Sequence, residues 1–344
     1  MQKNIEYCLN VLPQVSRTFA PTIRLLPKGL NVPVTVAYLL CRIADTIEDS
    51  ADLSLEQKRI FLNGYMQLFE NINQNNLDTF MDMISVIPKQ TPDENLAHNL
   101  ERVWAVYTSF SETTRKHIGR WVVEMSKGMH KYAQSTRKKR FTFLKTMQEL
   151  DEYTYYVAGT VGYLLTELFS HYSKKITPPL KGRLELFAES FGKGLQLVNI
   201  IRDMSTDIRR GQSYIPDELL RKYKLSRETI YEKDYQDQVQ EMFNELIISA
   251  VKHLDKALNY IVLIPKNESR IRLFCMLPLF WAMRTLQKIQ ENTLALLNSD
   301  KIKIPRTTIR REYYVALINS RSNRLMRRHY NKIRREIEDP LIAA

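Results

Sequence analysis

The amino-acid sequence predicts an all-α fold. Apolar residues recur at three- and four-residue spacing through long stretches, as in Val36, Leu39, Leu40, Ile43 and Ile47. Only 10 of the 344 residues are glycine, which disfavours loop-rich β folds. No G-x-G-x-x-G or G-x-x-x-x-G-K-[ST] motif occurs, so the usual nucleotide-binding α/β units are excluded. About ten helices and no confident strand are expected, in one domain that covers residues 1–344.

Capping boxes mark several of the expected helix starts. Ser54 is followed by Gln57, and Thr91 by Pro92 and Glu94, so helices are predicted to begin at Leu55 and Pro92. Further helical patterns cover residues 104–125, 143–169, 239–263 and 271–297. A basic C-terminal helix is expected over about 305–336.

Composition limits the classes of function. Cys8, Cys41 and Cys275 lack C-x-x-C spacing, which disfavours disulfides and a zinc site and favours a reducing compartment. Neither a signal peptide nor an apolar run of 18 residues is seen, so a cytoplasmic protein, soluble or peripheral to the membrane, is expected. The net charge of +13, concentrated at 137–140 and 301–335, favours polyanionic partners, with a solvated basic face as the alternative.

Two short acidic stretches carry the main clue to function. Asp45 and Asp49 are four residues apart, as are Asp203 and Asp207, so each pair shares one helix face. Such a pair is either a solvated face or a site for a cation, because like charges at this spacing repel. Two such faces turned toward each other would form a cage of oxygen ligands suited to Mg²⁺ carrying a diphosphate.

Polar residues extend these stretches. Gln196 and Asn199 precede Asp203 on the same helix face. Their amide oxygens can coordinate a metal, and their amide hydrogens can bind phosphate oxygens. Arg42, Arg202 and Arg209 are candidates to clamp a diphosphate with paired hydrogen bonds, although Arg209 could equally face water.

Two further segments carry candidate residues. Near the N-terminus, Ser16 and Thr18 offer two hydroxyls close to the aromatic ring of Phe19. Hydroxyl residues before a helix commonly cap it, so a helix cap is the simpler interpretation of this segment. In the second segment, Tyr153 precedes Gly159 and Gly162, which cost a helix roughly 1 kcal/mol each relative to alanine. These glycines are therefore expected where backbone lies close to another helix or to a ligand.

In this order and spacing, the segments resemble the squalene/phytoene synthase family of head-to-head prenyl synthases. The resemblance rests on Ser16 to Phe19, Tyr153 to Gly162 and Asn199 to Asp203. It implies an isoprenoid (terpenoid) synthase helical bundle around a central cavity that binds prenyl diphosphates. It also implies Mg²⁺, for which Mn²⁺ could substitute, on the ligands Asp45, Asp49, Asn199, Asp203 and Asp207.

Within the family the motifs lean toward the squalene synthase branch. Tyr156 to Gly159, Phe274 to Pro278 and Met125 to Met129 are similar to segments of that branch, whereas 160–162 and 196–199 are closer to phytoene or dehydrosqualene synthases. The resemblance implies condensation of two farnesyl diphosphates through presqualene diphosphate to squalene. It assigns proton steering to Tyr153, substrate contacts to Ser16, Thr18, Phe19, Arg42, Gln196, Asn199, Arg202 and Arg209, and NADPH contacts to Lys301, Lys303 and Arg306.

Departures from the family pattern keep alternatives open. Thr206 stands where the family usually has an acidic residue, and the C-terminal membrane anchor of eukaryotic squalene synthases is not seen. A phytoene or dehydrosqualene synthase without reductant, a basic helical nucleic-acid-binding protein and a catalytically dead assembly partner are the alternatives. A terpene cyclase is disfavoured, because the second stretch lacks the N-D-x-x-S-x-x-x-E pattern. We expect peripheral contact with anionic membrane, no nucleic-acid partner, and a monomer rather than an oligomer.

Overall fold

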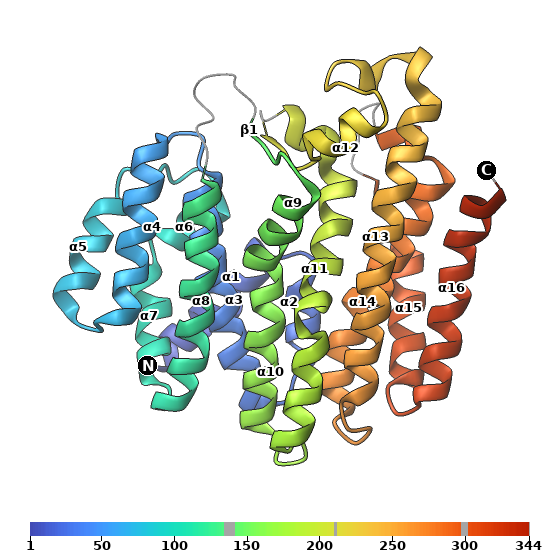
Figure 1. Ribbon diagram of the computed structural model, residues 1–344. Helices are drawn as coiled ribbons and strands as arrows, with labels where there is room; N and C mark the ends of the chain where they lie inside the picture. The colour runs from blue at the N-terminus through green and yellow to red at the C-terminus, as the bar shows by residue number, and fades with distance from the viewer. Residues whose placement is uncertain (134–141, 210–211, 297–301, 344) are drawn as a thin grey trace. The chain divides into compact units, whose positions relative to one another are not determined.

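The all-α prediction is confirmed by a computed structural model, which describes residues 1–133, 142–209, 212–296 and 302–343 (Figure 1). Within these residues sixteen α-helices form, more than the ten expected, because short helices of five or six residues lie between the long ones. One two-residue pair of parallel strands, β1 (Thr142–Phe143) and β2 (Gln212–Ser213), is also present. The sequence analysis expected no confident strand, and two residues are too short for a period-2 pattern to be seen.

Contacts divide the chain into two compact units. Unit 1 comprises Met1–Lys138 and Thr160–Lys181, and unit 2 comprises Lys139–Gly159 and Gly182–Ala344. The single-domain organisation expected from the sequence stays a prediction.

Unit 1 is built around helix α3 (Lys28–Asp49). Its other helices are α1 (Gln2–Val15), α2 (Phe19–Ile23), α4 (Leu55–Glu70), α5 (Gln74–Ile84), α6 (Pro92–Ala97), α7 (Leu100–Ser109), α8 (Glu112–Tyr132) and α10 (Thr160–Tyr172). Helix α3 contacts most of them, and its apolar face, Val36, Leu39, Leu40, Ile43 and Ile47, is fully buried as predicted. The predicted capping boxes form at Ser54 with Gln57 and at Thr91 with Glu94.

Among the described helices, α3 alone is long and apolar enough to cross a membrane, by length and composition. Two thirds (67%) of that stretch is buried inside the protein. Packing within unit 1 therefore accounts for its apolar character, as in the core helix of a soluble protein.

The first helix of unit 2 is α9 (Met147–Thr154), which continues into the π-helical turn η1 (Tyr155–Gly159). The unit also holds most of α11 (Pro178–Arg209), followed by α12 (Asp217–Lys222), η2 (Thr229–Tyr231), η3 (Lys233–Tyr235), α13 (Gln236–Leu263), α14 (Ser269–Glu291), η4 (Thr293–Leu296), α15 (Arg306–Asn319) and α16 (Asn323–Ala343). Helix α14 packs against α13, α15 and α16.

The single basic helix expected over 305–336 is two helices, α15 and α16, so that boundary was wrong. The break lies at 320–322, where the Ser322 hydroxyl accepts a hydrogen bond from the Leu325 amide at 3.3 Å. A serine hydroxyl in this position caps a new helix start.

Glycine permits a close approach between η1 and α11. A Cβ built on Gly192 would lie 1.9 Å from the carbonyl oxygen of Ala158, and one on Gly159 would lie 3.0 Å from the Glu189 side chain. The expectation of close backbone approach at Gly159 is therefore confirmed, and Gly192 is the tighter partner.

Gly192→Ala should therefore destabilise the protein by about 2–3 kcal/mol, because the added methyl group forces η1 and α11 apart. Gly182→Ala in the same helix is the matched control, since no atom lies within 4 Å of its Cβ position. The control should be neutral or more stable by up to about 1 kcal/mol. Urea unfolding measures both, and equal shifts would contradict the close approach.

Candidate active site

The first acidic stretch lies on the one face of α3 that its neighbours leave open. Arg42 and Asp45 are 31% and 33% exposed, and Asp49 at the last turn is exposed, whereas Ile43 and Ile47 between them are fully buried. Apolar packing on the other faces therefore fixes the direction in which the two aspartates point.

Arg42 is held between two carboxylates. Its Nε donates to Oδ1 of Asp93 in α6 at 2.7 Å, and its Nη1 lies 3.6 Å from Oδ2 of Asp45. Sequence reasoning missed Asp93, because it sits inside a capping box and gives no sign of reaching α3. The Arg42 side chain thus already neutralises part of the acidic face.

Burial raises the pKa of Asp45 to about 7; Arg42 opposes this, while Asp49 and Asp93 add to it. Burial also raises the pKa of Glu48 well above its ordinary value, with Asp49 and Asp45 contributing. Lys58 of α4, 1% exposed, faces Glu48 and Asp49, and its own pKa is lowered by burial. A further cation would therefore favour the ionised form of this acidic face.

The N-terminal segment lies beside the same face. The buried Ser16 hydroxyl accepts a hydrogen bond from the Phe19 amide at 3.1 Å, and the Phe19 ring lies 6.0 Å from that of Tyr38, one turn before Arg42. Ser16 therefore joins the end of α1 to the first residue of α2. Thr18 is exposed, and substrate contacts by these residues stay a prediction.

The second acidic stretch forms a half-exposed stripe along α11. Its members are Gln196, Asn199, Asp203 and Asp207. Between them Val198, Ile201 and Met204 are at most 3% exposed. The amide Nδ2 of Asn199 lies 3.4 Å from Oε1 of Gln196, so the two amides are joined as the spacing predicted.

Arg202 binds its neighbour Asp203 through both carboxylate oxygens, at 3.0 Å from Nε and 2.6 Å from Nη2. A metal on Asp203 would therefore have to displace this guanidinium. Thr206 is half-buried on the same turn. The side chain of Arg209 lies outside what the structure describes.

Tyr153 is 5% exposed near the end of α9, and its ring stacks on that of Tyr214, with centroids 4.8 Å apart and planes at 20°. The π-helical turn follows directly, a feature frequent at functional sites. Lys193 of α11, 4% exposed, reaches Asp151 of α9 at 2.9 Å and Glu189 at 2.5 Å. This ion triad fixes α9, and with it Tyr153, against α11.

Lys193 and Tyr214 were not predicted from the sequence. A signal existed for Lys193, because the α11 stripe continues backward from Gln196 to Lys193 and Glu189 at helical spacing. Tyr214 comes from a segment with no periodic pattern. The candidate cofactor residues Lys303 and Arg306 are exposed at the start of α15, and Lys301 lies outside the described residues.

In the part of the chain that the structure describes, no three His, Cys, Asp or Glu side chains gather closely enough to hold a metal. Each acidic pair thus offers at most two carboxylates. Mg²⁺ is commonly bound by one or two carboxylates together with substrate phosphates and water. The donor set fits Mg²⁺ that binds with a diphosphate, and it would accept Mn²⁺ as well.

The family model described as squalene/phytoene synthase matches residues 12–308. The chain belongs to the squalene/phytoene synthase family. The match includes both acidic stretches and the segment from Tyr153 to Gly162.

Among curated relatives, the squalene synthase of Schizosaccharomyces pombe is 30% identical over 301 residues, covering 88% of this chain. The chain spans 63% of the length of that relative. Among solved structures, TcSQS in complex with the ligand BPH1237 gives a TM-score of 0.78 at 21% identity, covering 99% of this chain and 98% of that one. A dehydrosqualene synthase in complex with ligand gives a TM-score of 0.62 at 21% identity, covering 92% of this chain and 95% of that one. The predicted all-α isoprenoid synthase fold is confirmed by these likenesses.

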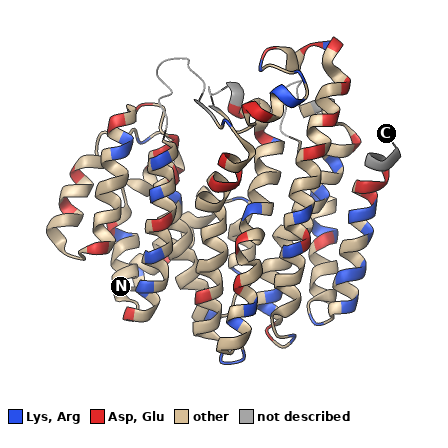
Figure 2. Cartoon of the chain, viewed as in Figure 1, with Lys and Arg blue, Asp and Glu red and all other residues tan. Residues whose placement is uncertain are grey.

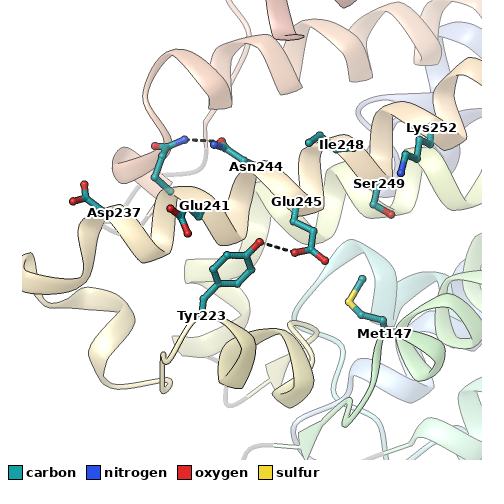
Figure 3. A pocket seen from close by; sticks show the side chains of 10 residues that line it. Met147, Tyr223, Asp237, Glu241, Asn244, Glu245, Ile248, Ser249 and Lys252 are labelled. Atoms are coloured by element: carbon teal, nitrogen blue, oxygen red, sulfur yellow. Dashed lines mark hydrogen bonds between the residues drawn. The ribbon is translucent and has the colours of Figure 1, made fainter. Parts of the chain in front are cut away.

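A cavity of about 810 Å³ in unit 2 lies apart from the residues that the family resemblance assigns (Figure 3). Helix α13 lines it with Asp237, Glu241 and Glu245, and the Tyr223 hydroxyl donates to Glu245 at 2.6 Å. None of the predicted site residues lines this cavity.

Asp45→Asn should stabilise the metal-free protein at pH 8 and have little effect near pH 4. The pKa of Asp45 is about 7 in the fold against 3.8 ordinarily, so the folded state holds this proton more tightly and loses stability as pH rises through that window. Since the side chain is 33% exposed, the gain should not exceed about 2 kcal/mol.

Thermal unfolding with a chelator at pH 4, 6 and 8 measures this difference. The exposed Asp78→Asn in α5 is the control and should show no such trend. A constant effect of Asp45→Asn at every pH would show that the carboxylate is not destabilised in the fold.

Proposed function

We propose that the protein condenses two farnesyl diphosphates head to head, through presqualene diphosphate, to squalene, with Mg²⁺ and NADPH. Membership of the squalene/phytoene synthase family and relatives named squalene synthase support this proposal. The observation that carries it is the pair of half-exposed acidic stripes, each flanked on its helix by buried apolar residues.

The carboxylates of Asp45, Asp49, Asp203 and Asp207, with the Asn199 amide oxygen, are the proposed metal ligands. The chemistry that Mg²⁺ supplies when bound is neutralisation of charge on the departing diphosphate. Their half-exposed positions leave these side chains reachable by a substrate, while the buried flanks keep them oriented.

Arg42 and Arg202 are proposed to bind the diphosphates by exchanging partners. In the free protein Asp93 holds Arg42, and Asp203 holds Arg202. Asp203 would release the Arg202 guanidinium if it held a metal ion, and the planar fork of Arg202 would then fit a diphosphate oxygen. Gln196 and Arg209 complete the proposed contacts on α11, and Ser16, Thr18 and Phe19 those near α3.

Tyr153 is proposed to guide proton loss as the cyclopropane ring closes, with the released diphosphate as the acceptor. The stack on Tyr214 and the Lys193–Asp151 bond restrain the position of its ring. Aromatic faces also favour a nearby carbocation. Water must be kept from this cation, and Tyr153, which is 5% exposed, lies in a buried position.

Lys303 and Arg306 are proposed contacts for NADPH, together with Lys301. Both described side chains are exposed cations, which suits the phosphates of a dinucleotide. The hydride for the second half-reaction is the chemistry that NADPH supplies when bound.

We further propose that both compact units act as one catalytic domain on the cytoplasmic side, in peripheral contact with anionic membrane. Unit 1 carries Asp45 and Asp49, and unit 2 carries Asp203 and Asp207. Neither unit alone therefore holds both acidic pairs that the reaction needs.

Asp45→Asn and Asp203→Asn should each reduce diphosphate release from farnesyl diphosphate at least about a hundredfold, because several kcal/mol of charge stabilisation is lost. Circular dichroism should show folded variants. The exposed Asp78→Asn and Asp234→Asn are matched controls and should retain activity. Normal Mg²⁺-dependent release by either folded site variant would refute the proposed metal ligands.

The likeness to a dehydrosqualene synthase structure favours a second candidate, a synthase that needs no reductant. With farnesyl diphosphate and Mg²⁺ alone, a squalene synthase should accumulate presqualene diphosphate and release squalene only after NADPH is added. Product analysis with and without NADPH, repeated with geranylgeranyl diphosphate, separates the two. Dehydrosqualene formed regardless of NADPH would favour the second candidate.

A further inference from the structure

The hairpin of α15 and α16 is fixed to unit 2 by buried charges. Glu312, fully buried, accepts hydrogen bonds from Arg284 of α14 at 2.8 Å and from His329 of α16 at 2.5 Å. Arg272, also fully buried, donates to Asn323 at 2.6 Å. These contacts hold the hairpin from its inner side, so its outer side is presented to solvent as a preformed surface.

Large apolar side chains gather on that outer side. Tyr314, Leu317 and Ile318 are 62%, 48% and 71% exposed, and their three- and four-residue spacing places them on one face of α15. Leu325, 41% exposed, follows across the turn in the first turn of α16. Exposed apolar side chains grouped in this way, and rimmed by polar residues, mark an interaction site.

The charge around these side chains has a single sign. Between residues 302 and 335 the only acidic residue is Glu312, which is fully buried. The exposed cations of this segment are Lys303, Arg306, Arg310, Arg311, Arg321, Arg324, Arg327, Arg328, Lys332 and Arg335. Figure 2 shows Lys and Arg in blue along α16, with carboxylates only toward its C-terminal end. The partner of this surface is therefore polyanionic as well as apolar.

We propose that the outer face of the α15–α16 hairpin docks on an anionic lipid membrane. Tyr314, Leu317, Ile318 and Leu325 insert among the acyl chains, and the surrounding arginines contact lipid phosphates. A nucleic acid would use the arginines but not the leucines and isoleucine, and a second copy would oppose two cationic faces. The proposal rests on the proposed function only for its purpose, which is delivery of an apolar product to lipid.

Sedimentation with phosphatidylcholine vesicles, with and without phosphatidylglycerol, tests this surface on the full chain. The protein should bind only the anionic vesicles, and salt should weaken binding. The double variants Leu317→Ser with Ile318→Ser, and Arg321→Glu with Arg324→Glu, should each reduce the partition coefficient at least about tenfold. Both should retain turnover of substrate presented in detergent.

Two exposed residues of α11 in the same unit serve as controls. Leu186→Ser, at a leucine that is 74% exposed, and Arg183→Glu should bind vesicles like the wild type. Asp45→Asn should also bind normally, so a failure of the proposed catalysis and a failure of docking are distinguishable.

Several results would overturn docking on lipid. They are no binding to anionic vesicles, equal binding to neutral ones, and unchanged binding by either double variant. Loss of a dimer in Leu317→Ser with Ile318→Ser, measured by sedimentation velocity without lipid, would assign the face to a second copy. Salt-dependent DNA binding that needs the arginines, with no vesicle binding, would assign it to nucleic acid.

Discussion

The candidate site depends on the partial burial of its carboxylates and arginines. On α3 and on α11, buried apolar residues flank a partly exposed stripe, and carboxylates occupy it. A carboxylate in such a position is costly without a positive partner. Each stripe has one within reach, Arg42 beside Asp45 and Arg202 on Asp203. In the free protein, each stripe thus carries a carboxylate whose charge an arginine partly compensates.

The same ion pairs also determine structure. The Arg42–Asp93 bond joins α3 to α6, and Lys193 joins α9 to α11 through Asp151. Loss of either would change both the local electrostatic potential and the orientation of the helix that presents the candidate side chain. A substitution at these residues is therefore expected to affect both helix packing and the charge of the candidate site.

Sequence periodicity was enough to predict what depends on neighbours along the chain. The buried face of α3, the capping boxes at Ser54 and Thr91, and the α11 stripe follow from spacing alone and are confirmed. Contacts between distant segments could not be predicted. Arg42 and Asp93 are 51 residues apart, and Tyr214 lies in a segment without a pattern. The break between α15 and α16 was missed because a serine such as Ser322 caps a helix only in a local geometry that composition does not reveal.

Because Gly192 has no side chain, the π-helical turn packs directly against the middle of α11. The Ala158 carbonyl occupies the space that any side chain at position 192 would need. A chimera that imports residues 147–159 from a relative would inherit a turn shaped for a different α11. A chimera between family members should therefore exchange the two segments together, although 32 residues lie between Gly159 and Gly192 in the chain.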